Sequence, residues 1–219
     1  MTDFLSKNKK ELKLLADYSY TGKNEKVFSN KIYWEGNKLY STCGGAMLYM
    51  TTENNPDGFT LMEVNKGKIS VVTDKKEIEK QKELKLYKRV MDRFTTYDFS
   101  FDFVWDKDLG LPVKLFSTKS ERYLDKAYFD FDKNELFCSF GDFDLDGVKV
   151  TYGDLFQNMK GTKPEKFRVP AWELFNLVKA EKKNTIHCEV GKIESKILGT
   201  QFYIKMDAGK YTCIAVGDN

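Results

Sequence analysis

The chain has 219 residues, of which 41% are hydrophobic and 15% aromatic, so it can build a packed core and is not wholly disordered. Its 36 Lys and Arg residues nearly balance 33 Asp and Glu residues, and a formal net charge of +3 excludes the strongly basic composition of a tight nucleic-acid binder. No apolar run approaches the roughly 20 residues of a membrane span. Charged residues are interleaved with apolar ones at the N-terminus, so we expect no signal peptide.

Three segments are predicted to form amphipathic helices, because their apolar residues recur with the helical period. They are residues 3–17, 83–94 and 170–183. In the third, Glu173 and Asn176 are expected to point away from the core. The basic residues predicted on the outward faces or flanks of the three helices are Lys9, Lys10, Lys13, Lys85, Lys88, Arg89, Lys179 and Lys183. Together they indicate a surface that faces a polyanion, although solvated Lys on any one helix is an equally ordinary explanation.

Between the helices the sequence is dominated by strand patterns. Alternating β-branched and aromatic runs on either side of turn residues predict four hairpins. The hairpins span residues 31–40, 61–72, 126–140 and 185–198, with turns expected at 36–37, 65–67, 132–134 and 190–192 respectively. Residues 97–105 alternate strictly and predict one further strand.

The hairpins suggest an internal repeat, in which 31–40 resembles 126–137 and 61–72 resembles 186–198. Charge, Gly and Pro interrupt the pattern at 105–112, which predicts a boundary between a first module, 1–107, and a second, 108–219. The strand at 97–105 would then close the first module, and 113–124 would supply the first helix of the second. The predicted class is α+β: two similar modules of mainly antiparallel sheet with amphipathic helices packed on one face.

The four cysteines, Cys43, Cys138, Cys188 and Cys213, are scattered through strand-like segments with no close pair. This spacing predicts free, buried thiols in a reducing compartment. We therefore expect a cytoplasmic protein, a term that includes the cytoplasm of a phage-infected cell.

Histidine occurs once, at His187, beside Cys188 in a predicted strand. A single His cannot build a site with two His ligands, and neighbouring strand residues point to opposite faces. We interpret His187 as structural.

Two acidic groups could in principle bind a metal. Residues 142–147 read DFDLDG, the opening of a calcium-binding loop, but Gly153 stands where such a loop needs a bidentate Glu. Asp130, Asp132 and Glu135 are explained more simply as the water-facing side of a hairpin. We assign no metal site and no cofactor.

No constellation combines an acid, a base and a nucleophile. Glu194 and Lys196 match the E-x-K of a metal-dependent nuclease, but the upstream Asp that such a core needs is not evident. Phosphate-binding Gly-rich loops and nucleophile elbows are also missing. The sequence therefore favours a binding or scaffolding protein over an enzyme.

The second half resembles one domain of a DNA sliding clamp, the ring-shaped processivity factor of replicative polymerases. The similarity runs through KAYFDFDKNELFCSFGDFDLDGVKV at 126–150, KFRVPAWELFNLVKAEKKNTIHCEVGKIESKILGTQFYIKM at 166–206, and YTCIAV at 211–216. The order is hairpin, strand, a strand ending in Val-Pro, an amphipathic helix, a hairpin and closing strands. The first half is similar more loosely, through the helix at 3–17 and NKIYWEGNKLYSTCGGAMLYMTT at 30–52.

The resemblance implies a viral or mobile-element clamp that encircles or rides on duplex DNA and serves a DNA polymerase or other replication proteins. In that family the helices line the central hole, so the eight basic residues would contact phosphates without reading bases. Two modules in each chain would imply a homo-oligomeric ring of three chains. The alternative is a small α+β protein–protein interaction module, such as a phage-encoded inhibitor of a host enzyme.

Overall fold

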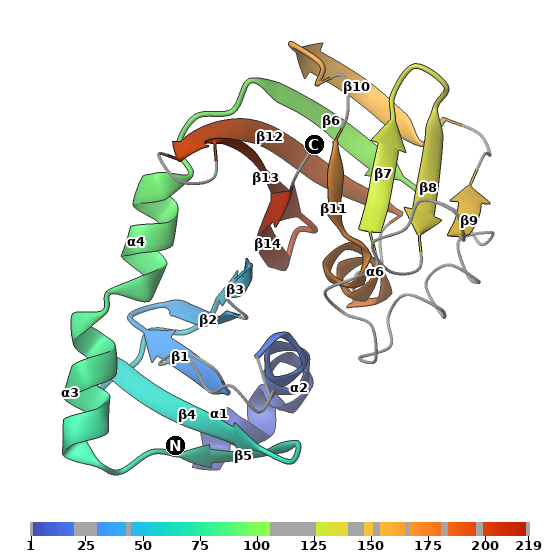
Figure 1. Cartoon of the computed structure of the whole chain (residues 1–219). Coiled ribbons are helices and arrows are strands. Elements are labelled where there is room, and N and C mark those ends of the chain that lie inside the picture. The colour runs from blue at the N-terminus through green and yellow to red at the C-terminus, as the bar shows by residue number, and fades with distance from the viewer. Residues whose placement is uncertain are drawn as a thin grey trace. The chain divides into compact units, whose positions relative to one another are not determined.

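The computed structural model describes residues 2–19, 30–42, 45–105, 126–139, 147–150, 154–164, 167–180, 184–195 and 199–217. The chain divides into two compact units, Met1–Arg93 and Phe94–Asn219. We call them unit 1 and unit 2 and describe each by itself (Figure 1). In the described part, no helix is both long enough and apolar enough to cross a membrane.

The described residues of unit 1 form an antiparallel sheet and four short helices. Its elements are α1 (Thr2–Lys7), α2 (Lys9–Tyr18), β1 (Lys31–Glu35), β2 (Lys38–Thr42), β3 (Ala46–Thr51), β4 (Phe59–Asn65), β5 (Lys68–Val71), α3 (Lys75–Glu83) and α4 (Leu86–Arg93). The strands follow the order β3-β2-β1-β4-β5, and every neighbouring pair is antiparallel. The helix predicted at 3–17 is confirmed as α1 followed directly by α2.

Two predicted hairpins of unit 1 are confirmed together with their turns. β1 and β2 are joined through Gly36, which has a φ of 54°, and β4 and β5 through Lys66 and Gly67, with φ values of 48° and 78°. These left-handed conformations are the ones that tight hairpin turns require and that Gly adopts without strain.

The helix predicted at 83–94 is confirmed as the shorter helix α4, Leu86–Arg93, and Glu83 is the last residue of a separate helix, α3. α3 ends at Glu83 and α4 begins at Leu86, because Lys85 between them has a φ of 46° and interrupts the helical hydrogen bonds. The sequence analysis missed α3. Its start was marked by Asp74 with Glu77 three residues later, and the Asp74 carboxylate accepts a hydrogen bond from the Lys76 amide at 2.9 Å.

The described part of unit 2 contains two antiparallel sheets and a helix. Its elements are β6 (Phe99–Val104), β7 (Lys126–Asp130), β8 (Glu135–Ser139), β9 (Gly147–Val150), β10 (Phe156–Gly161), β11 (Arg168–Pro170), α6 (Ala171–Ala180), β12 (Thr185–Ser195), β13 (Gly199–Asp207) and β14 (Tyr211–Gly217). One sheet has the order β10-β6-β12-β13-β14 and the other β11-β7-β8-β9.

Aromatic side chains join the two sheets of unit 2. Phe99, Phe101 and Phe103 alternate with less buried residues along β6, as predicted for this strand. The Phe101 ring lies 5.7 Å from that of Phe129 and 4.9 Å from that of Phe131, which belong to the facing sheet and its turn. Ring pairs at this spacing add favourable contacts to the burial of their apolar area.

The strand β6 belongs to unit 2. It pairs with β10 on one side and β12 on the other, whereas the sequence analysis placed it at the end of the first module. The two units divide between Arg93 and Phe94, and the expected boundary at 105–112 and helix at 113–124 fall almost entirely outside the described residues.

The third predicted hairpin is confirmed as β7 and β8, but the turn expected at 190–192 is wrong. β12 runs unbroken from Thr185 to Ser195, and Gly191 in its middle lies opposite Tyr203 of β13. A Cβ atom on Gly191 would overlap the carbonyl oxygen of Thr96 and the phenol of Tyr203. Gly191 therefore permits close approach within a sheet and does not form a turn. The proposed repeat of 61–72 in 186–198 fails for the same reason.

Three cysteines lie in the described part of the chain. Cys138, Cys188 and Cys213 are free and buried, as predicted, and Cys43 lies outside it. Burial is the main reason that the pKa of the Cys188 thiol is raised well above its ordinary value.

Candidate nucleic-acid interface

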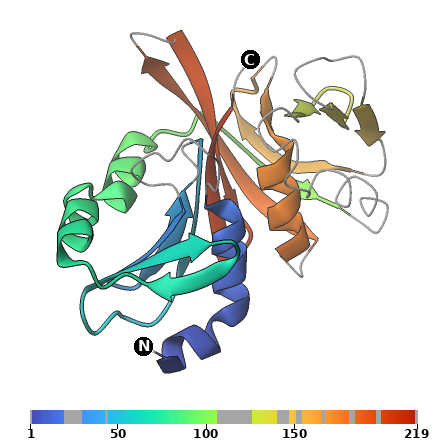
Figure 2. The same ribbon diagram turned by 60° about the horizontal axis from the view of Figure 1, so that its bottom comes forward.

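The helix α2 presents three lysines to solvent because its opposite side is anchored to the sheet. Leu12, Leu15, Ala16 and Tyr18 are buried, and the helix contacts β1, β2 and β3 (Figure 2). The hydroxyl of Ser41 on β2 donates a hydrogen bond to the carbonyl oxygen of Leu15 at 2.8 Å. This contact fixes the rotation of α2 and so decides which residues face outward.

We call Lys9, Lys10 and Lys13 the α2 stripe. All three are exposed, and none has an ion-pair or side-chain hydrogen-bond partner among the residues that the structure describes. Glu11, the acidic residue between them, is buried. Asp17, one helical turn beyond Lys13, is half-buried, so the exposed charge of the stripe is mainly positive and can attract a polyanion.

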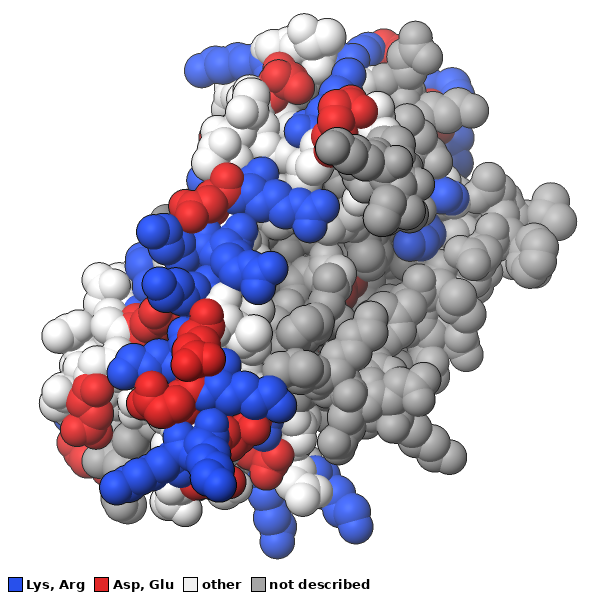
Figure 3. Space-filling view, turned by 60° about the vertical axis from the view of Figure 1, so that its left-hand side comes forward, with Lys and Arg blue, Asp and Glu red and all other residues white. Residues whose placement is uncertain are grey.

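The helix α4 also carries exposed cations. We call Lys85, Lys88 and Arg89 the α4 patch; their side chains likewise form no ion pair or hydrogen bond with any described residue. Lys88 and Arg89 are neighbours in α4, and Lys85 directly precedes the first residue of the helix. Figure 3 shows Lys and Arg gathered over α4, whereas basic and acidic residues interleave over α3.

The α2 stripe and the α4 patch belong to opposite faces of the unit 1 sheet. Tyr33 on β1 is paired with Tyr40 on β2, and Tyr40 with Tyr49 on β3, so these three side chains share one face. Tyr33 hydrogen-bonds Gln81 of α3, and the ring of Tyr87 of α4 lies 5.5 Å from Tyr40 and 5.3 Å from Tyr49.

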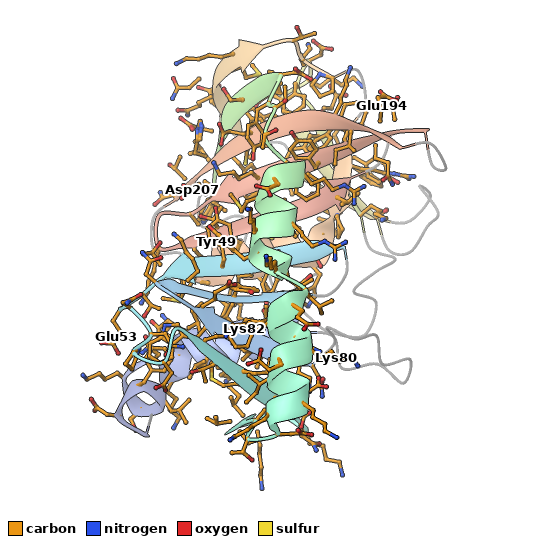
Figure 4. The ribbon with its side chains drawn as sticks, turned by 90° about the vertical axis from the view of Figure 1, so that its left-hand side faces the viewer. Tyr49, Glu53, Lys80, Lys82, Glu194 and Asp207 are labelled. Carbon is orange, nitrogen blue, oxygen red and sulfur yellow. The ribbon has the colours of Figure 1, made fainter. Side chains whose placement is uncertain are left out.

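The alternate residues of the same strands point to the other face, where α1 and α2 lie. The ring of Trp34 on β1 stacks on Phe4 of α1 at 3.6 Å, and Ser41 on β2 bonds α2. In Figure 4, α3 and α4 cross in front of the strands, with Lys80 and Lys82 on either flank of α3 and Tyr49 on the strand behind. The expectation that all the basic helix faces line one surface is therefore wrong for unit 1.

The helix α6 differs from its sequence prediction. Every residue from Ala171 to Val178 is buried, including Glu173 and Asn176, which were expected to face solvent. The reason is that α6 contacts β7 and β11 of one sheet and β14 of the other, so it is packed between layers and not on one surface. Lys179 is exposed at its end, and Lys183 lies outside the described residues.

The acidic residues of the β7–β8 hairpin, which the sequence analysis considered as metal ligands, form ion pairs with lysines. Asp130 pairs with Lys133 at 3.0 Å, Glu135 with Lys149 at 2.6 Å, and Asp132 with Lys163. Residues 142–146 of the DFDLDG loop lie outside the described residues. Among the residues that the structure describes, no group of three or more His, Cys, Asp or Glu side chains could hold a metal ion.

His187 forms one polar contact of note. Its Nδ1 lies 2.8 Å from a carboxylate oxygen of Asp102 on the neighbouring strand, and Asn158 donates to the other oxygen at 2.6 Å. Partial burial raises the pKa of Asp102, but the bonds from Asn158 and His187 outweigh burial, and the pKa lies below its ordinary value. Glu194, of the E-x-K motif, accepts a bond from Thr200 at 2.8 Å, and Lys196 lies outside the described residues. Neither group resembles a catalytic site.

Comparison with solved structures finds DNA polymerase III beta subunits. The beta subunit of Pseudomonas aeruginosa is 9% identical and matches 96% of this chain and 64% of its own, with a TM-score of 0.55. That of Thermotoga maritima is 12% identical, with coverages of 96% and 64% and a TM-score of 0.54. The beta clamp of Helicobacter pylori, solved with a DNA ligase peptide, is 11% identical, with coverages of 95% and 62% and a TM-score of 0.51.

The chain has the fold of a sliding clamp. The predicted class, α+β with mainly antiparallel sheet, is confirmed, and the structural neighbours are DNA polymerase III beta subunits and sliding clamps. At these identities the likeness concerns the fold alone. No protein-family model matches the sequence, and no curated protein does either. The chain spans a little over three-fifths of the length of the clamps that it matches.

Proposed function

We propose that this protein is a sliding-clamp-like processivity factor that encircles or rides on duplex DNA. The observation that carries the proposal is the clamp fold extending over 95–96% of the chain. A protein that holds DNA by enclosing it needs no strongly basic surface, so a net charge of +3 agrees with this role.

The α2 stripe is the proposed DNA contact of unit 1. Its lysines stand on a helix anchored to the sheet and carry no competing partner among the described residues. For unit 2, the proposed DNA contacts are Lys179 and Lys183. Mobile Lys side chains that touch phosphates give contact without base readout, which suits movement along a duplex. The α4 patch cannot share that duplex, because the sheet of unit 1 lies between.

The proposed assembly is a homo-oligomeric ring. Two modules in each chain, for which the sequence analysis proposed 1–107 and 108–219, would give a ring of three chains. Each unit does contain a helix followed by three antiparallel strands, α2 with β1–β3 and α6 with β12–β14. The proposed partners are duplex DNA and a cytoplasmic DNA polymerase or other replication proteins, of viral or mobile-element origin.

Charge reversal of the α2 stripe tests the DNA contact. The K9E/K10E/K13E variant should bind duplexes of unrelated sequence more weakly and to the same degree. The slope of log K against log salt should fall by about 0.9 for each phosphate that the variant no longer neutralises. Unchanged binding would remove α2 from the interface. Light scattering tests the ring: three times the mass of one chain is expected, and a stable monomer would favour the protein–protein interaction module.

A further inference from the structure

The α4 patch lies on the sheet face that the proposed duplex does not reach, and its cations are unused by the described part of the chain. Residues 85–93 contain Lys85, Lys88, Arg89 and Arg93 against a single acidic residue, Asp92. An excess of exposed positive charge on a helix that is held in place is a recognition surface for negative charge.

The two basic surfaces of unit 1 differ in pattern. In the α2 stripe the intervening acidic residue, Glu11, is buried, and Asp17, one helical turn beyond Lys13, is half-buried. In the α4 patch Asp92 is exposed, and its place one helical turn beyond Lys88 puts it on the same side of the helix. A duplex carries one negative charge for about every 1.7 Å of its axis, so it would set phosphates against Asp92 as well as against the cations. A protein segment can place its carboxylates selectively.

The borders of the α4 patch are apolar. No residue of α4 is fully buried, and Val90 and Met91, which flank the cations, are half-buried. Contact with these apolar side chains does not stabilise a bound phosphate, whereas the apolar side chains of a peptide can pack on Val90 and Met91. Charge complementarity and the apolar borders together favour a protein ligand over a nucleic acid.

We propose that the α4 patch docks an acidic segment of a partner protein, whose carboxylates meet Lys85, Lys88 and Arg89 and whose apolar side chains cover Val90 and Met91. The attraction between opposite charges would speed encounter and fix the register of the segment, and the apolar contacts would slow its release. Partner docking and DNA contact would then use opposite faces of unit 1 and would not compete.

The experiment compares two triple variants of the full chain, K85E/K88E/R89E and K9E/K10E/K13E. Each changes the formal net charge of +3 by the same amount, so each controls for the general effect of charge on the other. The probes are a fluorescein-labelled synthetic peptide of Glu-Glu-Leu repeats, the same peptide with Gln for Glu, and a labelled duplex. Fluorescence anisotropy gives the dissociation constants, and circular dichroism confirms that each variant is folded.

We expect the Glu peptide to bind the unaltered chain and the Gln peptide to bind far more weakly. The α4 reversal should weaken Glu-peptide binding by at least about tenfold, and the α2 reversal by less than about twofold. Duplex binding should show the opposite dependence. Equal loss of peptide binding in both variants, or none in the α4 variant, would overturn the proposal. Loss of duplex binding in the α4 variant alone would make the patch a nucleic-acid surface. If the peptide measurements agree with expectation but the α2 reversal leaves duplex binding unchanged, the proposed DNA contact is contradicted and peptide docking is not.

Discussion

The phenol of Tyr33 donates a hydrogen bond to the side-chain oxygen of Gln81 at 2.9 Å, and both side chains are buried. The bond ties α3 to the face of the sheet opposite α2. The side-chain nitrogen of Gln81 in turn donates to Glu77, one helical turn earlier, at 2.9 Å. Burial is the main cause of a raised pKa for Tyr33, which therefore keeps its donor proton. The separation of the two basic surfaces of unit 1 depends on this attachment.

Removing the Tyr33 hydroxyl should loosen α3. Tyr33→Phe removes the hydrogen bond to the buried side chain of Gln81, and we expect the free energy of unfolding, measured with urea, to fall by about 0.5–1.5 kcal/mol. Lys80→Ala, an exposed change on the same helix, should stay within about 0.5 kcal/mol of the unaltered chain. Equal stability of the Phe variant and the unaltered chain would show that the bond does not anchor α3.

Gly191 should not tolerate even one added methyl group. In Gly191→Ala the Cβ atom meets the Thr96 carbonyl and the Tyr203 phenol, so β12 or its neighbours must move. Overpacking of this kind costs about 1–3 kcal/mol, measurable as a lower midpoint of urea unfolding. Gly45→Ala is the matched control, because a Cβ there has no neighbour within 4 Å. If both variants lose the same stability, close approach at Gly191 is not the cause.

Acid should weaken unit 1 partly through Glu63. A hydrogen bond from the Lys31 ammonium, 2.8 Å away, is the main reason that the pKa of Glu63 lies below its ordinary value of 4.5. The folded state therefore binds fewer protons at Glu63 than the unfolded state does. The stability from this pair is complete above pH 4.5 and is lost as the pH falls through the lowered pKa.

Glu63→Gln removes this titration. Between about pH 6 and about pH 3.5, the urea midpoint of the Gln variant should fall by less than that of the unaltered chain. Glu63 is partly exposed, so the difference will be small. If the stability of the unaltered chain relative to the Gln variant instead grew as the pH fell, the sign would be wrong for this mechanism.

All four cysteines should be reduced. In denaturant without reductant, a thiol reagent should find four thiols. In the native protein, Cys138, Cys188 and Cys213 should react slowly because they are buried. A count of two or fewer in denaturant would show that a disulfide is present.

Local signals in the sequence predicted much of the fold. The Gly-Asn turn at 36–37 and the alternation in 97–105 identified the β1–β2 hairpin and β6, because turn chemistry and strand period act within a few residues. Gly191 was misread for the opposite reason. A glycine in a strand pattern fits either a turn or a close approach, and only Thr96 and Tyr203, distant in sequence, decide between them.

The candidate interface was predicted less well, because it depends on which face of each sheet a helix packs against. The lysines of α2 were correctly placed on its outer side, because that helix rests on one sheet. Helical periodicity could not show that α6 is covered by two sheets, which buries Glu173 and Asn176. Nor could it show that two adjacent residues of β2 contact different helices on opposite faces of the sheet: Tyr40 contacts α4, and Ser41 contacts α2.

The most direct test of clamp function is whether the protein is held on DNA by enclosure. The protein is allowed to load over the ends of a linear duplex biotinylated at both ends, streptavidin is added to block them, and the salt concentration is then raised. High salt abolishes phosphate contacts but leaves a closed ring threaded. We predict retention on the blocked duplex and loss from an identical duplex with free ends. Equal loss from both would contradict a sliding clamp.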